Sequence, residues 1–502
     1  MNNLREKTGK GIFWSVIQKW GRSGIATVIF IILSRKLDPD AFGLVAIASA
    51  FTIFIELFLD QGFGSAIVQR VVLEPEHLDT AFWINILTGS LMTAGLVAAS
   101  GFVATAFHEP RLTAVLRWLS ISFVLSSLSS TQISILQRKL AFKDLALRSL
   151  IANAIAGVVG VGMAFAGFGV WSLVGQDLVS DLAGAIILWK ASDWRPGFKV
   201  SMRHYKDLFS FGVSIVGNNA LTVMIRRSDD LLIGFFLGSR LLGFYTIGYQ
   251  LLLIIIRLVT EVTNSVAFPA FSRIQHQPER MRKAFYKVTQ YTSLFAFPVF
   301  IGLAVLASDL VPAVFGKKWA PSIPVMQVLS LIGILQSVLF FNGSVIKASG
   351  KPSWQFGIML LNAICSILGF LLAVRWGIVA VAASFVIVGY LLSPVSYLAV
   401  QKLIHIDFRT YLSQYIVPLT ASLAMVAVVE GLKYVLGDTS LNRYVKLAVY
   451  VFAGGLSYLL VIAVMARSLF LQVLEFVGSI LPGRKIARMR RTAKNLDERV
   501  ES

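Results

Sequence analysis

Apolar residues run in long unbroken stretches from one end of this 502-residue chain to the other, and short polar segments separate them. As a helix, a stretch of about 20 apolar residues is long enough to cross the roughly 30 Å hydrocarbon core of a membrane. The stretches do not alternate with polar positions, so they predict helices and exclude a membrane β-barrel. We predict about fourteen membrane-spanning helices, at 12–34, 41–60, 81–107, 115–136, 146–167, 169–189, 207–227, 241–267, 288–313, 322–346, 354–374, 377–401, 411–435 and 445–466.

The composition agrees with a membrane protein. Hydrophobic residues make up 56% of the chain and charged residues only 14%, whereas soluble domains carry about 25% charged residues. The predicted loops are short, which leaves no room for a soluble catalytic domain. Cys365 is the only cysteine, so no disulfide can form within the chain. The predicted fold class is therefore an all-α integral membrane protein.

A weak internal repeat, offset by 200 residues, relates two parts of the chain. Gly43 falls on Gly243, and the turn-then-helix pattern of 33–50 recurs at 231–250. Six spans in each half keep both halves in the same orientation, which gives a parallel repeat around a central cavity, as in alternating-access transporters. We predict two pseudo-symmetric six-helix lobes at 1–200 and 201–405, two appended transmembrane helices at 406–470 and a basic cytoplasmic tail at 471–502.

Basic residues are concentrated on one side of the predicted helices. Most of the 46 Lys and Arg residues lie in the N-terminus, in alternate loops such as 138–148 and 190–206, and in the tail. Under the positive-inside rule, this distribution places both termini in the cytoplasm. Orientation and contact with anionic membrane lipids therefore explain the net charge of +20, without a nucleic-acid partner.

Four cations lie within or near predicted spans, where charges are rare. Lys19 and Arg22 are three residues apart and share a face of the first helix, and Arg226 and Arg227 end the seventh. A charge at the bilayer centre costs about 2.5–3.5 kcal/mol, so such residues usually face a cavity or a partner. Guanidinium and ammonium groups bind phosphate oxygens, and we predict that these four residues contact an anionic substrate.

Internal pairing is the alternative role for these cations. Arg226 and Arg227 precede Asp229 and Asp230 closely enough to form ion pairs within the lobe. Both arginines also lie near the end of their span, from which long side chains can reach the membrane surface. The sequence leaves these alternatives open.

Other polar residues in the spans are candidates for ion coupling or for sugar contacts. Glu56 and Asp60 are four residues apart on the second predicted helix, where they can bind a coupling proton or cation. Glu56 can instead neutralise Lys19. Asn218 and Asn219 interrupt the apolar run of the seventh span, and their amides can bond to sugar hydroxyls or to neighbouring helices.

Motifs for other chemistry are missing from the sequence. There is no Gly-rich phosphate loop followed by Lys and Ser or Thr, so nucleotide hydrolysis is not expected. The histidines are scattered, with no two within one helical turn, and we expect neither a metal site nor a cofactor. They are His77, His108, His204, His276 and His405.

Three segments carry a resemblance to a known family. LSRKLDPDAFGLVAIA at 33–48, followed by FLDQGFGSAIVQR at 58–70, resembles the polysaccharide transport branch of the multidrug/oligosaccharidyl-lipid/polysaccharide exporter superfamily. DDLLIGFFLGSRLLGFYTIGYQ at 229–250 resembles the second-half signature of that branch. Within the branch, the chain looks closest to the colanic-acid-type lipid-linked oligosaccharide flippases.

The resemblance implies fourteen helices in two lobes and a location in the bacterial cytoplasmic (inner) membrane. It implies flipping of undecaprenyl-pyrophosphate-linked oligosaccharide units to the periplasmic leaflet, in concert with a polysaccharide polymerase and export machinery. One alternative is a multidrug or cation antiporter of the same superfamily, whose cavity should be acidic. Another is a membrane glycan polymerase or ligase, which the short loops disfavour.

The predicted topology is testable by labelling single cysteines. Thirteen predicted spans separate Lys10 from Asp438, so the two positions should lie on opposite sides of the membrane. In a Cys365→Ser background, we expect Lys10→Cys and Asp438→Cys to react with an impermeant thiol reagent from opposite sides. Labelling of both positions from the same side would contradict the topology.

Overall fold

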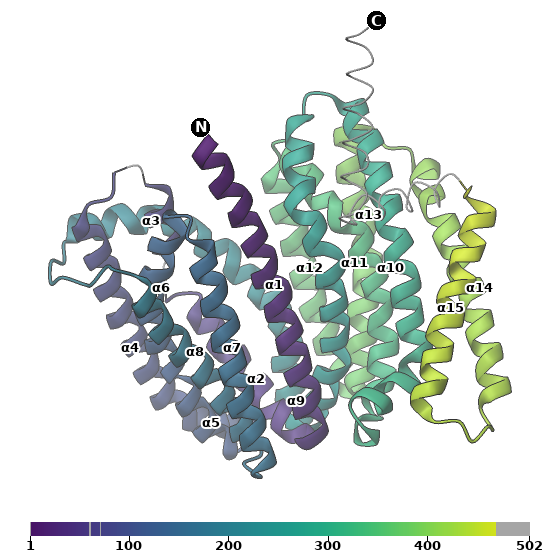
Figure 1. Cartoon of the computed structure of the whole chain (residues 1–502), viewed down its shortest axis with the longest axis horizontal. Coiled ribbons are helices and arrows are strands. Elements are labelled where there is room, and N and C mark those ends of the chain that lie inside the picture. The colour runs from purple at the N-terminus through teal and green to yellow at the C-terminus, as the bar shows by residue number, and fades with distance from the viewer. Residues whose placement is uncertain (1, 60–61, 71, 468–502) are drawn as a thin grey trace, which may run out of the picture. The chain divides into compact units, whose positions relative to one another are not determined.

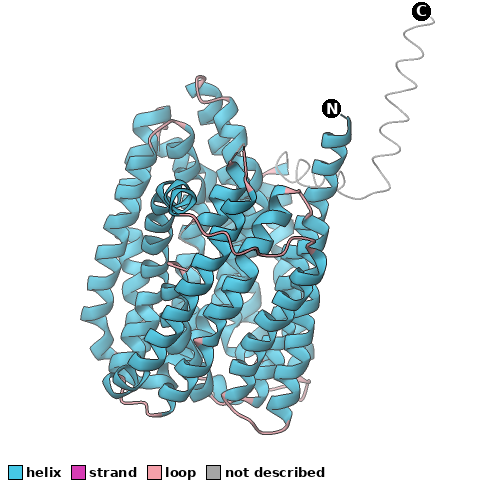
Figure 2. Cartoon of the chain, turned by 90° about the vertical axis from the view of Figure 1, so that its left-hand side faces the viewer, coloured by secondary structure: helices cyan, strands magenta, loops and turns pink. Residues whose placement is uncertain are grey.

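The computed structural model describes residues 2–59, 62–70 and 72–467, with the backbone alone given at 2–13, 210–222, 224–226 and 257–266. The described residues form helices joined by short loops, and no strand occurs among them (Figure 2). The elements are α1 (Asn2–Lys36), α2 (Pro39–Glu56), α3 (Phe63–Gln69), α4 (Pro75–Ala106), α5 (Arg111–Leu119), α6 (Ile121–Arg138), α7 (Phe142–Phe165), α8 (Trp171–Ala191), α9 (Met202–Arg273), α10 (Pro278–Val314), η1 (Lys317–Trp319), α11 (Ser322–Ala348), α12 (Pro352–Ala373), η2 (Val374–Trp376), α13 (Ile378–Ile404), α14 (Phe408–Leu436) and α15 (Arg443–Met465).

Thirteen helical segments within the described residues are long and apolar enough to cross a membrane. Each of them overlaps one of the predicted spans, which confirms the all-α integral membrane fold. The predicted span at 207–227 is the one without a counterpart, because it falls on the part of α9 where mostly the backbone is described.

The chain divides into two compact units. The first unit contains the chain up to Leu258 together with Leu310–Ile332 and Lys351–Ser396. The second unit contains Val259–Asp309, Gly333–Gly350 and the chain from Tyr397 onward. The predicted division into six-helix lobes at 1–200 and 201–405 remains a prediction.

Small residues allow the helices of the first unit to pack closely. α7 lies against both α1 and α8, and α4 lies against α5 and α6 (Figure 1). Gly157 of α7 faces Ile29 of α1, where a Cβ would lie only 2.1 Å from the Ile29 side chain. Gly160, one turn further along, faces Gln176 of α8 in the same way. Close packing of this kind is a main source of stability between helices in lipid, where the hydrophobic effect between them is weak.

Two repeat-related glycines bring α2 and α9 into backbone contact. A Cβ built on Gly43 would lie 1.7 Å from the carbonyl oxygen of Ser239, and one on Gly243 would lie 2.0 Å from that of Pro39. Pro39 and Ser239 are themselves one repeat apart, so the two contacts mirror each other. α9 is interrupted at Gly238, whose φ is 84°, and the equivalent position one repeat earlier, Asp38, lies in the break between α1 and α2. These contacts support the internal repeat.

Polar groups from two loops reinforce this contact. Lys318 of η1 donates a hydrogen bond from Nζ to the carbonyl oxygen of Leu37 at 2.6 Å. Burial lowers the pKa of Lys318, and the charge of Asp38 opposes that shift. In the second half of the repeat, the hydroxyl of Ser239 in α9 donates to the carboxylate of Glu109, which lies in the loop between α4 and α5. Each half of the repeat thus receives a polar contact from a loop of the other.

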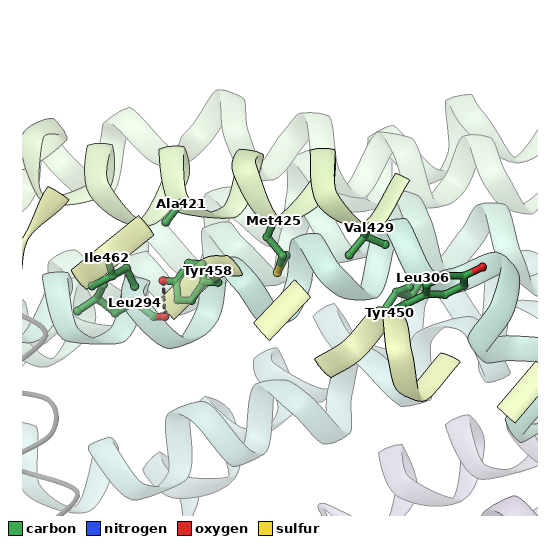
Figure 3. Close-up of a cluster of buried hydrophobic side chains, with 8 residues drawn as sticks. All are labelled: Leu294, Leu306, Ala421, Met425, Val429, Tyr450, Tyr458 and Ile462. Carbon is green, nitrogen blue, oxygen red and sulfur yellow. Dashed lines mark hydrogen bonds between the residues drawn. The ribbon is translucent and has the colours of Figure 1, made fainter. Parts of the chain in front are cut away.

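A cluster of buried side chains holds α14 and α15 onto α10 in the second unit (Figure 3). The hydroxyl of Tyr458 donates to the carbonyl oxygen of Leu294 at 2.7 Å, and Figure 3 shows this bond beside Ile462. Gly454 leaves space for Val429 of the neighbouring helix, since a Cβ there would lie 2.9 Å from its side chain. The remaining members of the cluster are Leu306, Ala421, Met425 and Tyr450.

We predict that a methyl group at either repeat glycine destabilises the conformation described here. Gly43→Ala and Gly243→Ala place a Cβ against a backbone carbonyl, which cannot rotate away, and overpacking of this kind costs about 1–3 kcal/mol. Thermal unfolding of the purified variants in detergent measures the loss. Gly24→Ala is the matched control, because nothing lies within 4 Å of a Cβ at that position. Equal unfolding temperatures for Gly43→Ala and Gly24→Ala would refute the prediction.

Candidate functional site

A polar cavity of about 460 Å³ lies among the membrane-spanning helices of the first unit. Four charged residues line it, each from a different helix: Arg22 of α1, Glu56 of α2, Arg148 of α7 and Asp181 of α8. One face of α6 and the start of α3 complete the lining. A volume of this size holds a small polar group such as a phosphate or a sugar ring.

The face of α6 that lines the cavity is a row of hydroxyl groups. Ser126, Ser129, Ser130, Ser134 and Gln137 recur at spacings of three and four residues, which puts them on one side of the helix. The hydroxyls of Ser129 and Ser134 donate to carbonyl oxygens one turn earlier in α6. Their oxygen lone pairs therefore remain acceptors for a donor in the cavity.

The carboxylates of the cavity lie beside α6. Glu56 accepts a hydrogen bond from the hydroxyl of Ser126 at 3.1 Å, and Ser122 lies close to Asp181. Asp181 also lies close enough to Arg22 and Arg148 to interact with both charges. The acids thus partly neutralise the two guanidinium groups.

Arg148 occupies space that a glycine provides. Its Nε donates to the carbonyl oxygen of Gly184 at 3.4 Å, and a Cβ on Gly184 would lie 2.7 Å from its Nη2. Any side chain at position 184 would therefore displace the guanidinium. Arg148 lies near the start of the predicted span at 146–167 and was not predicted as a site residue; α7 begins at Phe142, so Arg148 lies in its second turn. The serine spacing on α6 is the signal that could have located the cavity.

Only some of the predicted site residues line this cavity. Arg22 and Glu56 line the cavity, whereas Lys19, on the same helix as Arg22, is not part of the lining. Glu56 bonds to Ser126, so the alternative of a Lys19–Glu56 pair has no counterpart among the described contacts. The side chains of Arg226, Asn218 and Asn219 and the whole of Asp60 lie outside the described residues.

Arg227 is paired inside its own helix. Its Nη1 lies 2.9 Å from Oδ2 of Asp230, which is buried. The neighbouring Asp229 accepts the hydroxyl of Tyr245 at 2.9 Å and the backbone N–H of Asp230 at 3.0 Å. This arrangement is the internal pairing considered for Arg227 from the sequence, and contact of Arg227 with substrate remains a prediction.

The structure also brings two histidines together. The ring centroids of His77 in α4 and His204 in α9 are 4.2 Å apart, with Glu74 beside them. The expectation that the histidines form no cluster is therefore wrong for this pair. Helical spacing could not have revealed it, because the two residues are distant in sequence.

The helices are arranged as in solved transporters. The lipid II flippase MurJ, in its inward closed conformation, aligns with a TM-score of 0.75 at 15% identity, over 91% of this chain and 99% of that chain. An inward-facing multidrug resistance MATE family transporter of the MOP superfamily gives a TM-score of 0.59 at 14% identity, over 78% of this chain and 98% of that chain. The protein therefore shares the fold of these two transporters.

Sequence comparison identifies the family. The family described as polysaccharide biosynthesis protein matches residues 32–324, and the chain belongs to it. Teichuronic acid biosynthesis protein TuaB of Bacillus subtilis is 28% identical over 91% of this chain and 96% of its own length. Succinoglycan biosynthesis transport protein ExoT of Rhizobium meliloti is 28% identical over 94% of this chain and 96% of its own. Lipopolysaccharide biosynthesis protein WzxC of Escherichia coli is 25% identical over 86% of this chain and 89% of its own length. The resemblance inferred from the sequence is confirmed.

We predict that the Arg227–Asp230 pair stabilises the folded protein. Arg227→Ala leaves the buried carboxylate of Asp230 without its partner, and an unsatisfied buried group costs about 1–3 kcal/mol, and more when it is charged. Adding Asp230→Asn removes the unpaired charge, so we expect the double variant to regain stability. Thermal unfolding of both variants measures this coupling. A double variant less stable than Arg227→Ala alone would show that the pair does not act as a unit.

Proposed function

We propose that this protein flips lipid-linked oligosaccharide units from the cytoplasmic to the outer leaflet of a bacterial cytoplasmic membrane by alternating access. The observation that carries the proposal is the cavity with Arg22 and Arg148, which lies within the membrane-spanning helices of a polysaccharide biosynthesis family member. Such a substrate has an anionic pyrophosphate, a hydroxyl-rich glycan and an apolar tail. The cavity offers complementary groups for the first two.

The pyrophosphate is the part that most needs the protein. Moving an unpaired anion through hydrocarbon costs many kcal/mol, and paired guanidinium groups reduce that cost. Arg22 and Arg148 face one cavity from two helices, and guanidinium binds phosphate oxygens in a bidentate geometry. Lys19, one turn before Arg22, would meet the anion at the cavity entrance. Arg226 stays a candidate of the same kind.

The glycan would use the neutral polar groups. The serine face of α6 presents several acceptors along the cavity wall, and sugar hydroxyls can donate to them. Asn218 and Asn219 remain candidates for contacts with the same sugars. Hydroxyl recognition of this kind is tolerant, which suits a transporter whose relatives TuaB, ExoT and WzxC bear the names of three different glycans.

The lipid tail would stay outside the cavity. Transfer of a polyprenyl chain into a wet polar site costs about 0.8 kcal/mol for each CH₂ group, or tens of kcal/mol in total. α14 and α15 present many exposed apolar side chains, among them Phe452 and Val464, and would form an apolar surface for the tail. An undecaprenyl chain is an apolar polyprenyl tail of this kind.

The driving force would come from an ion gradient rather than from a nucleotide. Glu56 and Asp181 share the cavity with the arginines, so binding of a proton or cation to these acids would change the affinity of the cavity for the anion. Asp60 is a further candidate for coupling. The product would pass to a polysaccharide polymerase and export machinery.

Export assays on cavity variants test the proposal. We expect Arg22→Ala and Arg148→Ala each to reduce glycan export at least tenfold in cells that lack the native gene, because each removes a guanidinium from the cavity. Lys19→Ala should have a smaller effect, since Lys19 is not part of the cavity lining. Arg375→Ala, which removes an exposed arginine of η2, is the matched control for loss of charge. Membrane insertion and thermal unfolding of each variant show whether it is folded.

A cation antiporter is the second candidate, and the acids of the cavity favour it. Glu56 and Asp181 would bind a cationic drug as the arginines would bind an anion. Loss of drug resistance in a Glu56→Gln, Asp181→Asn variant, together with normal glycan export by folded Arg22→Ala and Arg148→Ala proteins, would favour this candidate and overturn the flippase proposal.

A further inference from the structure

Four ionisable side chains and a guanidinium meet where α4 and α9 begin. Nε2 of His204 lies 2.8 Å from Oε2 of Glu74, and Nε2 of His77 lies 3.9 Å from Oδ2 of Asp207. Arg70 reaches the same Asp207 carboxylate at 3.0 Å. Two carboxylates and two imidazoles, all of them possible metal ligands, thus lie together beside the Arg70 guanidinium.

Each histidine has a nitrogen that is buried without a hydrogen-bond partner. These atoms are Nε2 of His77 and Nδ1 of His204, and His77 is only 1% exposed. Buried polar atoms in folded proteins nearly always have a partner, so Nε2 of His77, which lies 3.9 Å from the Asp207 carboxylate, indicates a missing ligand at this site. One ligand atom from each of Glu74, His77 and His204 lies within 4.8 Å of the others.

We propose that Glu74, His77 and His204 bind a divalent zinc ion, with Asp207 within reach as a fourth ligand. Imidazole nitrogens with carboxylate oxygens are a donor set that zinc favours. In a tetrahedral zinc site, ligand atoms lie about 3.3 Å apart, given metal–ligand bonds of about 2.0–2.1 Å. The two contacts of 2.8 Å and 3.9 Å fall on either side of that spacing, so small side-chain movements would create the site.

The hydrogen bonds around the histidines indicate a reversible site. Nδ1 of His77 accepts the backbone N–H of Glu74 at 3.2 Å, so the neutral ring carries its proton on Nε2. Coordination through Nε2 moves that proton to Nδ1 and gives up the 3.2 Å bond, which weakens binding. The Glu74 side chain is 55% exposed, so water and metal can reach the cluster from solvent. We therefore infer exchangeable rather than permanent zinc.

The bound ion would connect two helices, α4 and α9, that are far apart in the chain. The segment between α8 and α9 already bonds to α4, through the N–H of Gly197 to Asp79 at 2.9 Å and the N–H of Ser201 to Thr80 at 3.1 Å. A metal held by α4 and α9 would add the strongest link at this junction. Zinc would therefore restrain the beginning of α9 relative to α4.

Zinc binding to the purified full-length protein tests the proposal. The protein is prepared in detergent with a tag that contains no histidine, stripped with a chelator, and titrated with zinc chloride by calorimetry. We expect one saturable zinc per chain and a higher unfolding temperature in its presence, because the ion binds the folded state. Cobalt in place of zinc should give the intense visible absorption of a tetrahedral site.

Variants locate the ion. We expect His77→Ala and His204→Ala to weaken zinc binding at least tenfold, and His276→Ala, which removes an exposed histidine elsewhere, to leave it unchanged. Absence of saturable zinc binding by the wild-type protein would overturn the proposal, whatever the folding of the variants. Zinc affinity of a His77→Ala, His204→Ala double variant equal to that of the wild type would overturn it as well.

Discussion

The need to compensate charge at membrane depth governs the arrangement of the first unit. Arg22 and Arg148 lie among membrane-spanning helices. An isolated guanidinium there would lose its hydration, and no partner would offset that loss. Asp181 and the hydroxyls of α6 supply the missing partners. The helices that carry these groups must therefore meet around one polar cavity. Their remaining faces pack on other helices or face lipid.

The first unit also depends on close backbone contact between α2 and α9, which glycines at repeat-related positions allow. Gly43 and Gly243 let α2 and α9 approach until one helix touches the carbonyl oxygens of the other. Lys318 and Glu109 add polar bonds to this contact, and the buried ring of Trp319 packs edge-on against Phe42 and Phe244 beside it. The contact between α2 and α9 therefore combines close backbone packing, hydrogen bonds and buried aromatic side chains.

The apolar pattern was sufficient to predict the membrane helices, because span length and hydropathy are properties of each segment alone. Contacts between segments were harder to predict. The charge of Arg148 was counted with the adjoining loop because it lies near the start of its predicted span, and hydropathy does not define a helix start to within a turn. Arg22, which lies deep within its predicted span, lines the cavity, and its contact with substrate stays a prediction. His77 and His204 meet only through the packing of α4 and α9, which no local pattern encodes.

The balance of charge in the cavity bears on how a transporter can release an anion. A cavity with arginines alone would bind pyrophosphate tightly and would also be unstable when empty, because the two cations would repel each other. With Glu56 and Asp181 in the same lining, the empty cavity is compensated by its own acids. Under the proposed function, an entering anion would compete with Asp181 for the guanidinium groups, and the acids would regain these partners when the anion leaves. Such a site would bind the anion only weakly, and a carrier needs that property because tight binding would prevent release.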